Sequence, residues 1–173
     1  MIKIILNPLQ GIEIVNGKVI TLGDSKTELL NKLGKPSEVN DDSLFYDEFE
    51  LRVDIDSSGN IEFIEFICGP FPEKTEIEIY GINPFKSQSL DLIELLTIEN
   101  DGVVDSSEAP YCYTFLESSI GVYRDAFEEE IDELIEGMKE MGVYLENKEW
   151  VLDDKEKAKY FWTIGLGVKD YYK

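Results

Sequence analysis

Histidine is absent from this chain of 173 residues. Without it the sequence lacks the commonest general base and zinc ligand, and both the Ser-His and the Cys-His nucleophile systems. A phosphate-binding loop is also missing, and Gly165-Leu166-Gly167 has neither the third glycine nor the following helix of a dinucleotide-binding loop. No pair of carboxylates stands in apolar surroundings that would raise a pKa for acid–base work. The sequence therefore predicts that the protein is not an enzyme and uses no cofactor or metal.

Cysteines and long apolar runs are scarce as well. Cys68 and Cys112 are too few and too far apart to indicate a disulfide framework or a zinc site, and buried free thiols are expected instead. No apolar run approaches the roughly 20 residues of a membrane span. The N-terminus MIKIILNP lacks the organisation of a signal peptide. A cytoplasmic location is therefore the expectation.

Basic residues are few: 16 stand against 37 acidic residues, and the formal net charge is −21. That charge argues against binding nucleic acid, whose phosphates need the opposite field, and against contact with anionic membranes. It favours fast, salt-sensitive association with a basic partner. The alternative is an acidic surface that serves only solubility.

The chain nevertheless has what a folded core needs, with 43% hydrophobic and 12% aromatic residues. Its length suits a single domain spanning residues 1–173, or two packed halves, 1–68 and 73–173. Gly69-Pro70-Phe71-Pro72 marks the break between these halves.

Residues 49–67 carry the clearest structural pattern. Phe49, Leu51, Val53 and Ile55 alternate with charged residues, residues 56–60 supply turn formers, and an apolar strand pattern then resumes. This predicts a β-hairpin with the four apolar side chains buried. The neighbouring Phe63 and Ile64 break the alternation, so the second strand is either covered on both faces or bulged.

The same stretch resembles a calcium-binding loop. Asp54, Asp56, Ser58, Gly59 and Glu65 fall on the ligand and glycine positions of an EF-hand. An EF-hand needs a helix on each side, and neither flank has a helical stripe. The hairpin is therefore the preferred interpretation, with Glu65 pointing away from the other carboxylates.

The remaining pattern predicts an α+β fold, predominantly antiparallel sheet with about three helices. Ser25 and Glu28 form a capping box for a helix at 25–33, and Asn16-Gly17 marks an earlier hairpin. Ser87 or Ser89 is expected to cap a second helix at 90–96. Strands, a helix and more strands follow one another in each half. The halves are therefore either two related meanders or a generic α+β order.

A third helix is predicted at 127–141, starting with a capping box of Asp125 and Glu128. Residues 143–152 are expected to form a strand, 153–159 a polar connector or a short helix, and 161–168 a strand whose glycines allow bends or close backbone approach. At 100° per residue, one side of the third helix gathers carboxylates, which we select as candidate partner-binding residues. They are Glu129, Asp132, Glu133, Glu136 and Glu140. A merely solvated helix face is the alternative.

The C-terminal stretch FWTIGLGVKDYY, and Gly23-Asp24-Ser25 before a Leu-rich helix ending in Gly34-x-Pro36, complete the pattern. A small, acidic α+β protein with these features resembles the immunity proteins of bacterial polymorphic-toxin and contact-dependent growth inhibition systems. The resemblance implies a one-to-one complex with a cognate toxin domain, often a basic nuclease, whose active site is blocked.

Two other functions fit the sequence. A surface of spaced carboxylates can mimic nucleic acid and sequester a protein that binds it. Alternatively, an accessory domain could bind a peptide or small ligand in an aromatic groove. The groove residues would be Tyr111, Tyr113, Trp150 and Trp162.

Overall fold

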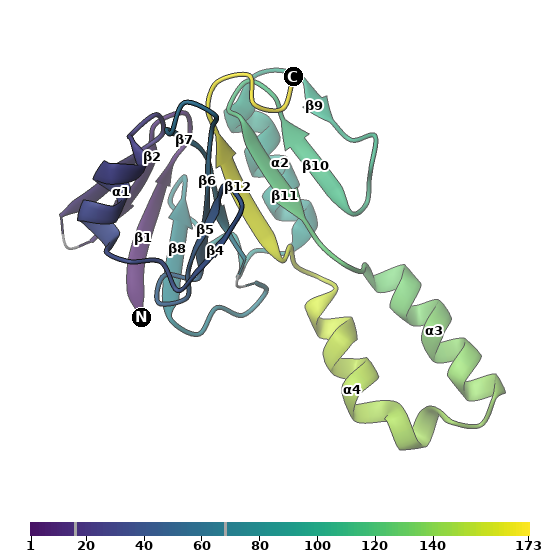
Figure 1. Ribbon diagram of the computed structural model, residues 1–173. Helices are drawn as coiled ribbons and strands as arrows, with labels where there is room; N and C mark the ends of the chain where they lie inside the picture. Colours follow the sequence, from purple (N-terminus) through teal and green to yellow (C-terminus); the bar gives the residue numbers. More distant parts are fainter. Residues whose placement is uncertain (16, 68) are drawn as a thin grey trace.

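A computed structural model describes residues 1–15, 17–67 and 69–173. In this part of the chain the fold is α+β, with four helices and two mostly antiparallel sheets (Figure 1). None of the described helices has both the length and the apolar character needed to cross a bilayer.

The smaller sheet has the strand order β3-β2-β1-β8. Its strands are β1 (Ile2–Asn7), β2 (Gly11–Ile14), β3 (Lys18–Thr21) and β8 (Thr75–Ile79), and β1 and β8 run parallel. Helix α1 (Lys26–Leu33) follows β3. The predicted capping box is confirmed, because Ser25 Oγ accepts from the Glu28 amide while the Glu28 carboxylate accepts from the Ser25 amide.

The larger sheet has eight strands in the order β4-β5-β6-β7-β12-β11-β10-β9. Four come from the first half: β4 (Glu38–Asn40), β5 (Ser43–Tyr46), β6 (Leu51–Ile55) and β7 (Ile61–Phe66). The others are β9 (Val104–Asp105), β10 (Cys112–Phe115), β11 (Ile120–Tyr123) and β12 (Thr163–Gly167). The two meanders join where β7 pairs with β12.

The order of elements repeats along the chain. Helix α1 precedes the meander β4 to β7, and helix α2 (Ser89–Asn100) precedes the meander β9 to β12. The second meander is interrupted by α3 (Glu128–Glu140) and α4 (Tyr144–Lys157), which lie between β11 and β12. At the matching place the first meander has only the turn at 56–60. This repeated order is what a duplication of one ancestral half would produce, but a generic α+β order produces it as well. The duplication therefore stays a prediction.

The main core lies between the inner faces of the two sheets and under α2. Ile4 and Ile77 of the small sheet, Leu96 of α2, and Ile64 and Ile164 of the large sheet all belong to one buried cluster. The α3–α4 pair has a separate small core. The apolar contacts that hold α3 and α4 together are therefore made between these two helices and not with the sheets.

The predicted central hairpin is confirmed. Phe49, Leu51, Val53 and Ile55 are buried, and β6 pairs with β7 around the turn at 56–60. Both explanations for the broken alternation hold. The register shifts between Asp54 and Ile55, and Phe63 on the outer face is covered by the stacked ring of Tyr171.

Three smaller predictions are wrong. Residues 143–152 are not a strand, because they belong to α4, which packs on α3. Neither predicted serine caps α2: Ser87 donates to the Asn83 carbonyl, and Ser89 accepts from Arg124. The residue at the N-cap of α3 is Phe127, so no box forms there.

The predictions for the two cysteines and for the first hairpin are tested only in part by the described residues. Cys112 is a free cysteine but is only half-buried, and burial raises the pKa of its thiol. Asn16 of the first hairpin and Cys68 lie outside the described residues. The pairing of β2 with β3 is nevertheless antiparallel, as the predicted hairpin requires.

Candidate functional site

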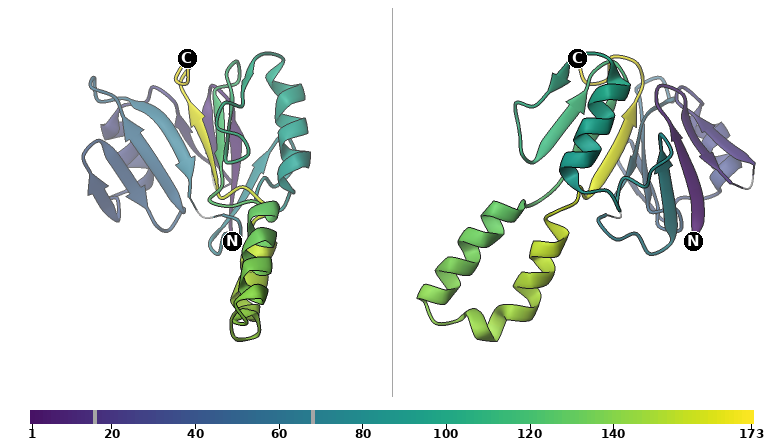
Figure 2. Two further views of the ribbon diagram at one scale, coloured as in Figure 1. Left: turned by 90° about the vertical axis from the view of Figure 1, so that its right-hand side faces the viewer. Right: turned by 180° about the vertical axis from the view of Figure 1, so that it is seen from behind.

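Helices α3 and α4 form a hairpin that extends away from both sheets (Figures 1 and 2). The helices pack on each other through a seam of apolar side chains at helical spacing. The buried members are Ile131, Ile135, Met138, Val151 and Ala158. Most of the outer surface of the hairpin is therefore free to contact another molecule.

Arg124 holds the base of this hairpin in place. Its Nε donates to the Pro110 carbonyl at 2.9 Å, and its Nη1 donates to Ser89 Oγ at 2.9 Å and to the Ala158 carbonyl at 3.2 Å. The guanidinium also lies 5.3 Å from the ring centre of Phe161. Burial lowers the pKa of Arg124, but the side chain stays charged. One side chain thus ties α2, the 110 loop and both ends of the hairpin together.

All five carboxylates selected from the sequence are exposed on α3. Asp132 forms an ion pair with Lys155 of α4, and Glu136 forms one with Lys139 at 2.7 Å. Glu129, Glu133 and Glu140 have no lysine or arginine partner within the described chain. Lys139 is the single basic residue of α3. The outer surface of α3 is therefore strongly acidic and only partly neutralised.

Sequence reasoning did not predict the apolar residues exposed on the same hairpin, of which it selected only Trp150 as a candidate binding residue, for the aromatic groove. They are Leu134 (41% exposed), Met141 (71%), Leu145 (83%), Trp150 (45%) and Leu152 (43%). Three of them lie in α4, whose residues the sequence pattern assigned to a strand followed by a polar connector or a short helix. Helical spacing over residues 144–157 would have placed them beside the acidic surface of α3. Exposed apolar groups rimmed by charge are typical of protein-binding surfaces.

A second polar cluster lies on the outer face of the large sheet. Arg52 forms ion pairs with Asp54 at 2.8 Å and with Glu65 at 3.1 Å, next to a hollow of about 220 Å³. Burial raises the pKa of Glu65, and the charge of Arg52 offsets only part of that rise. The sequence predicts that Glu65 points away from the other carboxylates of the hairpin. That prediction is wrong with respect to Asp54, because both carboxylates pair with Arg52.

The flanks of this cluster are strands, which the EF-hand interpretation does not allow. The described residues contain no group of three or more Cys, Asp or Glu side chains arranged to hold a metal ion. Arg52 already neutralises the carboxylates that face it. The cluster is best explained as a structural ion-pair network across β6 and β7.

Other hollows lie elsewhere on the described chain. One, of about 240 Å³, is lined by Asp105, Ser107, Glu108, Cys112, Thr114 and Tyr172. Burial raises the pKa of the Cys112 thiol there, which disfavours the reactive thiolate.

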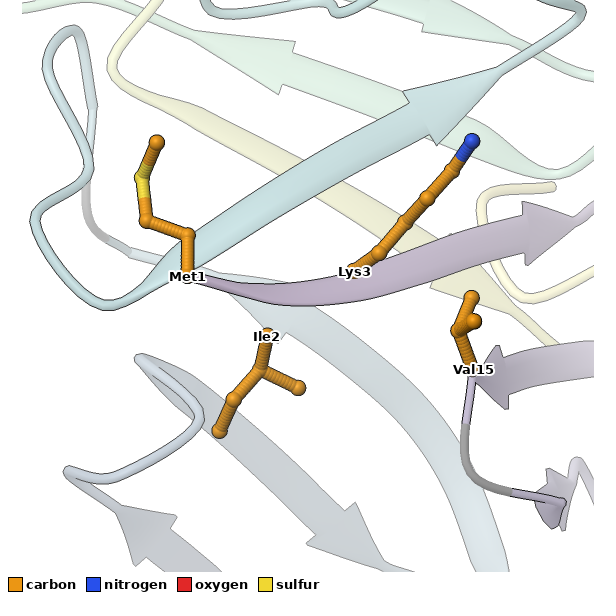
Figure 3. A pocket seen from close by; sticks show the side chains of 4 residues that line it. All are labelled: Met1, Ile2, Lys3 and Val15. Atoms are coloured by element: carbon orange, nitrogen blue, oxygen red, sulfur yellow. The ribbon is translucent and has the colours of Figure 1, made fainter.

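Another hollow, of about 400 Å³, lies beside Tyr80, Glu99 and Glu117. A further one, of about 240 Å³, is lined by Met1, Ile2, Lys3 and Val15 (Figure 3). In Figure 3 Lys3 and Ile2 project to opposite sides of β1, as strand alternation requires. Lys3 itself is paired with Glu78 at 2.7 Å.

Three of the four residues proposed for an aromatic groove, Tyr111, Tyr113 and Trp150, each contact a different neighbour. Tyr113 packs on Phe161, with ring centres 6.0 Å apart, and Tyr111 packs on Phe127 at 5.4 Å. Trp150 lies on α4 and donates its indole N–H to Asn147. These aromatic side chains make separate contacts rather than lining one cavity.

Comparisons with protein-family models, with curated proteins and with solved structures give no match to this chain. The functional argument therefore depends on the surface of the α3–α4 hairpin.

Proposed function

We propose that this chain is an immunity-type protein that binds and neutralises a cognate bacterial toxin domain of basic charge. The observation that carries the proposal is the projecting α3–α4 hairpin, whose acidic surface also exposes apolar side chains. An inhibitor of this kind acts by occupancy, so it needs complementarity to its target and no catalytic group. The net charge of −21 favours a basic partner.

The position of the hairpin supports this role. It replaces a tight turn in a sheet whose two meanders are otherwise alike in order. Binding residues are often carried by segments that a rigid scaffold presents at its surface. A hairpin anchored by Arg124 presents its surface without having to order itself on binding, which lowers the entropic cost of association.

Charge reversal on the hairpin tests the proposal. A partner is first isolated by co-purification from the source cell, and its toxicity and the neutralisation of that toxicity are measured by co-expression. Replacing Glu129, Glu133 and Glu136 together by Lys should slow association about ten-fold or more at low salt and leave dissociation less affected. Stopped-flow kinetics over a range of salt concentrations gives both rates.

A matched triple variant controls for net charge. Glu13, Glu38 and Glu48 are exposed and lie outside the hairpin, and their replacement by Lys changes the charge of the protein equally. This control should slow association much less than the hairpin variant. Equal slowing in both variants would show that only the overall charge matters. Recovery of a small molecule as the sole tight ligand would overturn the proposal.

A further inference from the structure

The two sides of the α3–α4 hairpin differ in chemistry. Successive residues of an α-helix are rotated by about 100°. Measured from the buried Ile131, this places Asp132 and Lys139 on one side of α3 and Leu134 and Met141 on the opposite side. Glu130 lies on the same side as Leu134.

The same rotation sorts the residues of α4. Measured from the buried Val151, Lys148, Leu152 and Lys155 lie on one side, and Trp150 and Asp154 lie on the other. The contact between Lys155 and Asp132 shows which sides of the two helices coincide. The ring of Tyr144 under Lys139 agrees with this assignment.

The hairpin therefore has a lysine face and a Trp150 face. The lysine face consists of Asp132, Lys139, Leu145, Lys148, Leu152 and Lys155. The Trp150 face consists of Glu130, Leu134, Met141, Trp150 and Asp154. Carboxylates beside the lysine face are partly neutralised, since Lys155 pairs with Asp132 and Lys139 with Glu136. Lys157, towards the other side at the base, is paired with Asp153 at 2.6 Å.

Aromatic surface continues from the Trp150 face towards the large sheet. Tyr111 packs on Phe127 at the start of α3, and desolvation, followed by the nearby negative charge of Glu130, raises the pKa of the Tyr111 hydroxyl. The carboxylates of Glu130 and Asp154 thus border the apolar Leu134 and Trp150. Interface hot spots have this composition, with a tryptophan anchor inside a ring of polar groups.

We propose that the Trp150 face is the surface that contacts the partner, and that it receives an apolar side chain flanked by lysines or arginines of a basic protein. Leu134 and Trp150 supply the apolar contact, while Glu130 and Asp154 pair with the flanking cations. This assignment rests on the proposed function and moves the contact away from the five carboxylates chosen from the sequence, which then act in steering. A second copy of this acidic chain is disfavoured by like charge.

Two synthetic peptides of equal positive charge probe this face directly. One is an amphipathic helix of Lys and Leu, and the other contains Lys and Ser in the same positions. In the Trp162→Phe variant, Trp150 is the remaining tryptophan. The Lys–Leu peptide should shift the fluorescence of Trp150 to shorter wavelength, and the Lys–Ser peptide should not. No shift with either peptide overturns the inference.

Two matched double variants give a second measurement in the otherwise unchanged chain. Leu134→Ala with Trp150→Ala should weaken binding of the labelled Lys–Leu peptide about ten-fold in fluorescence anisotropy. Leu145→Ala with Leu152→Ala, on the lysine face, should change it less than about two-fold. An equal or reversed effect of the two pairs overturns the inference.

The outcomes also separate the inference from the proposed function. If the Glu129, Glu133 and Glu136 reversal weakens toxin-domain binding but the Leu134 and Trp150 pair does not, the hairpin is the docking element and the assigned face is wrong. If neither set changes binding to the toxin domain, both proposals fail. Self-association in sedimentation, lost in the Leu134 and Trp150 pair, would assign this face to a dimer instead.

Discussion

At the scale of single residues, Glu50 joins the two halves of the chain. It precedes β6 and adopts a positive φ of 50°, which is uncommon for a residue with a side chain. Its carboxylate accepts hydrogen bonds from the amides of Glu73, Lys74 and Thr75, and from the Thr75 hydroxyl at 2.6 Å. The strained backbone is therefore compensated by four donors that fix the start of β8.

Replacing Glu50 by Gln should destabilise the protein. The amide side chain retains one oxygen acceptor and directs its NH₂ group at donors, so we expect a loss of about 1–3 kcal/mol in the free energy of unfolding at pH 7. Urea denaturation measures this loss. Glu48→Gln, at an exposed position, is the control and should change stability by less than about 0.5 kcal/mol.

The pH dependence of the same variant has a defined sign. Burial by itself raises the pKa of Glu50. The hydrogen bonds from Thr75 and from the backbone amides together lower the pKa by more than burial raises it, so the folded-state pKa lies below the ordinary value of 4.5. The stabilisation is therefore present above about pH 4.5 and is lost as the pH falls through the folded-state pKa. The wild type should lose more stability than Glu50→Gln below pH 4.5. Parallel curves for the two proteins would contradict this.

At the scale of elements, the sequence predicts some helices and strands far better than others. The hairpin of β6 and β7 was predictable because every apolar residue on one face of β6 is buried against the same core. Helix α4 was not, because its buried contacts are limited to Val151 and Ala158, with Tyr144 partly covered. With so few buried apolar residues, the sequence of α4 shows only a weak repeat of apolar residues at helical spacing. Packing on α3 decides the structure there, and the β-forming residues around 143–152 favour the wrong prediction.

The separate core of the hairpin predicts local unfolding. Replacing the fully buried Val151 by Ala removes contacts from the α3–α4 seam alone. The free energy of local opening of the two helices should therefore fall by about 1–3 kcal/mol, and their amide protons should exchange faster. Amides of β6 and β7 should keep their protection in hydrogen-exchange mass spectrometry. Val53→Ala, equally buried but in the main core, should lower protection throughout the chain. Loss of protection in β6 after the Val151 change would show that the two cores unfold together.

At the scale of the whole molecule, the antiparallel class was predictable and the assembly of the large sheet was not. Pairing between β7 and β12 joins residues about one hundred positions apart, and no local pattern specifies it. The five carboxylates on α3 were correctly placed at the surface. Their exposed apolar neighbours became visible only once α4 lay beside α3, since a candidate binding surface depends on which helices pack together.

The net charge of −21 predicts how the stability of the entire fold responds to salt. Like charges repel one another more in the compact state than in the expanded unfolded chain, so screening favours folding. Raising NaCl from about 10 mM to about 150 mM shortens the Debye length from about 30 Å to about 8 Å, whereas the exposed ion pairs lose little. The Tm should therefore rise, by about 2–4 °C for each kcal/mol recovered, in differential scanning calorimetry. The less acidic Glu13, Glu38 and Glu48 to Lys variant should show a smaller rise, and a Tm that falls with salt in the wild type would mean that attractive ion pairs outweigh the repulsion.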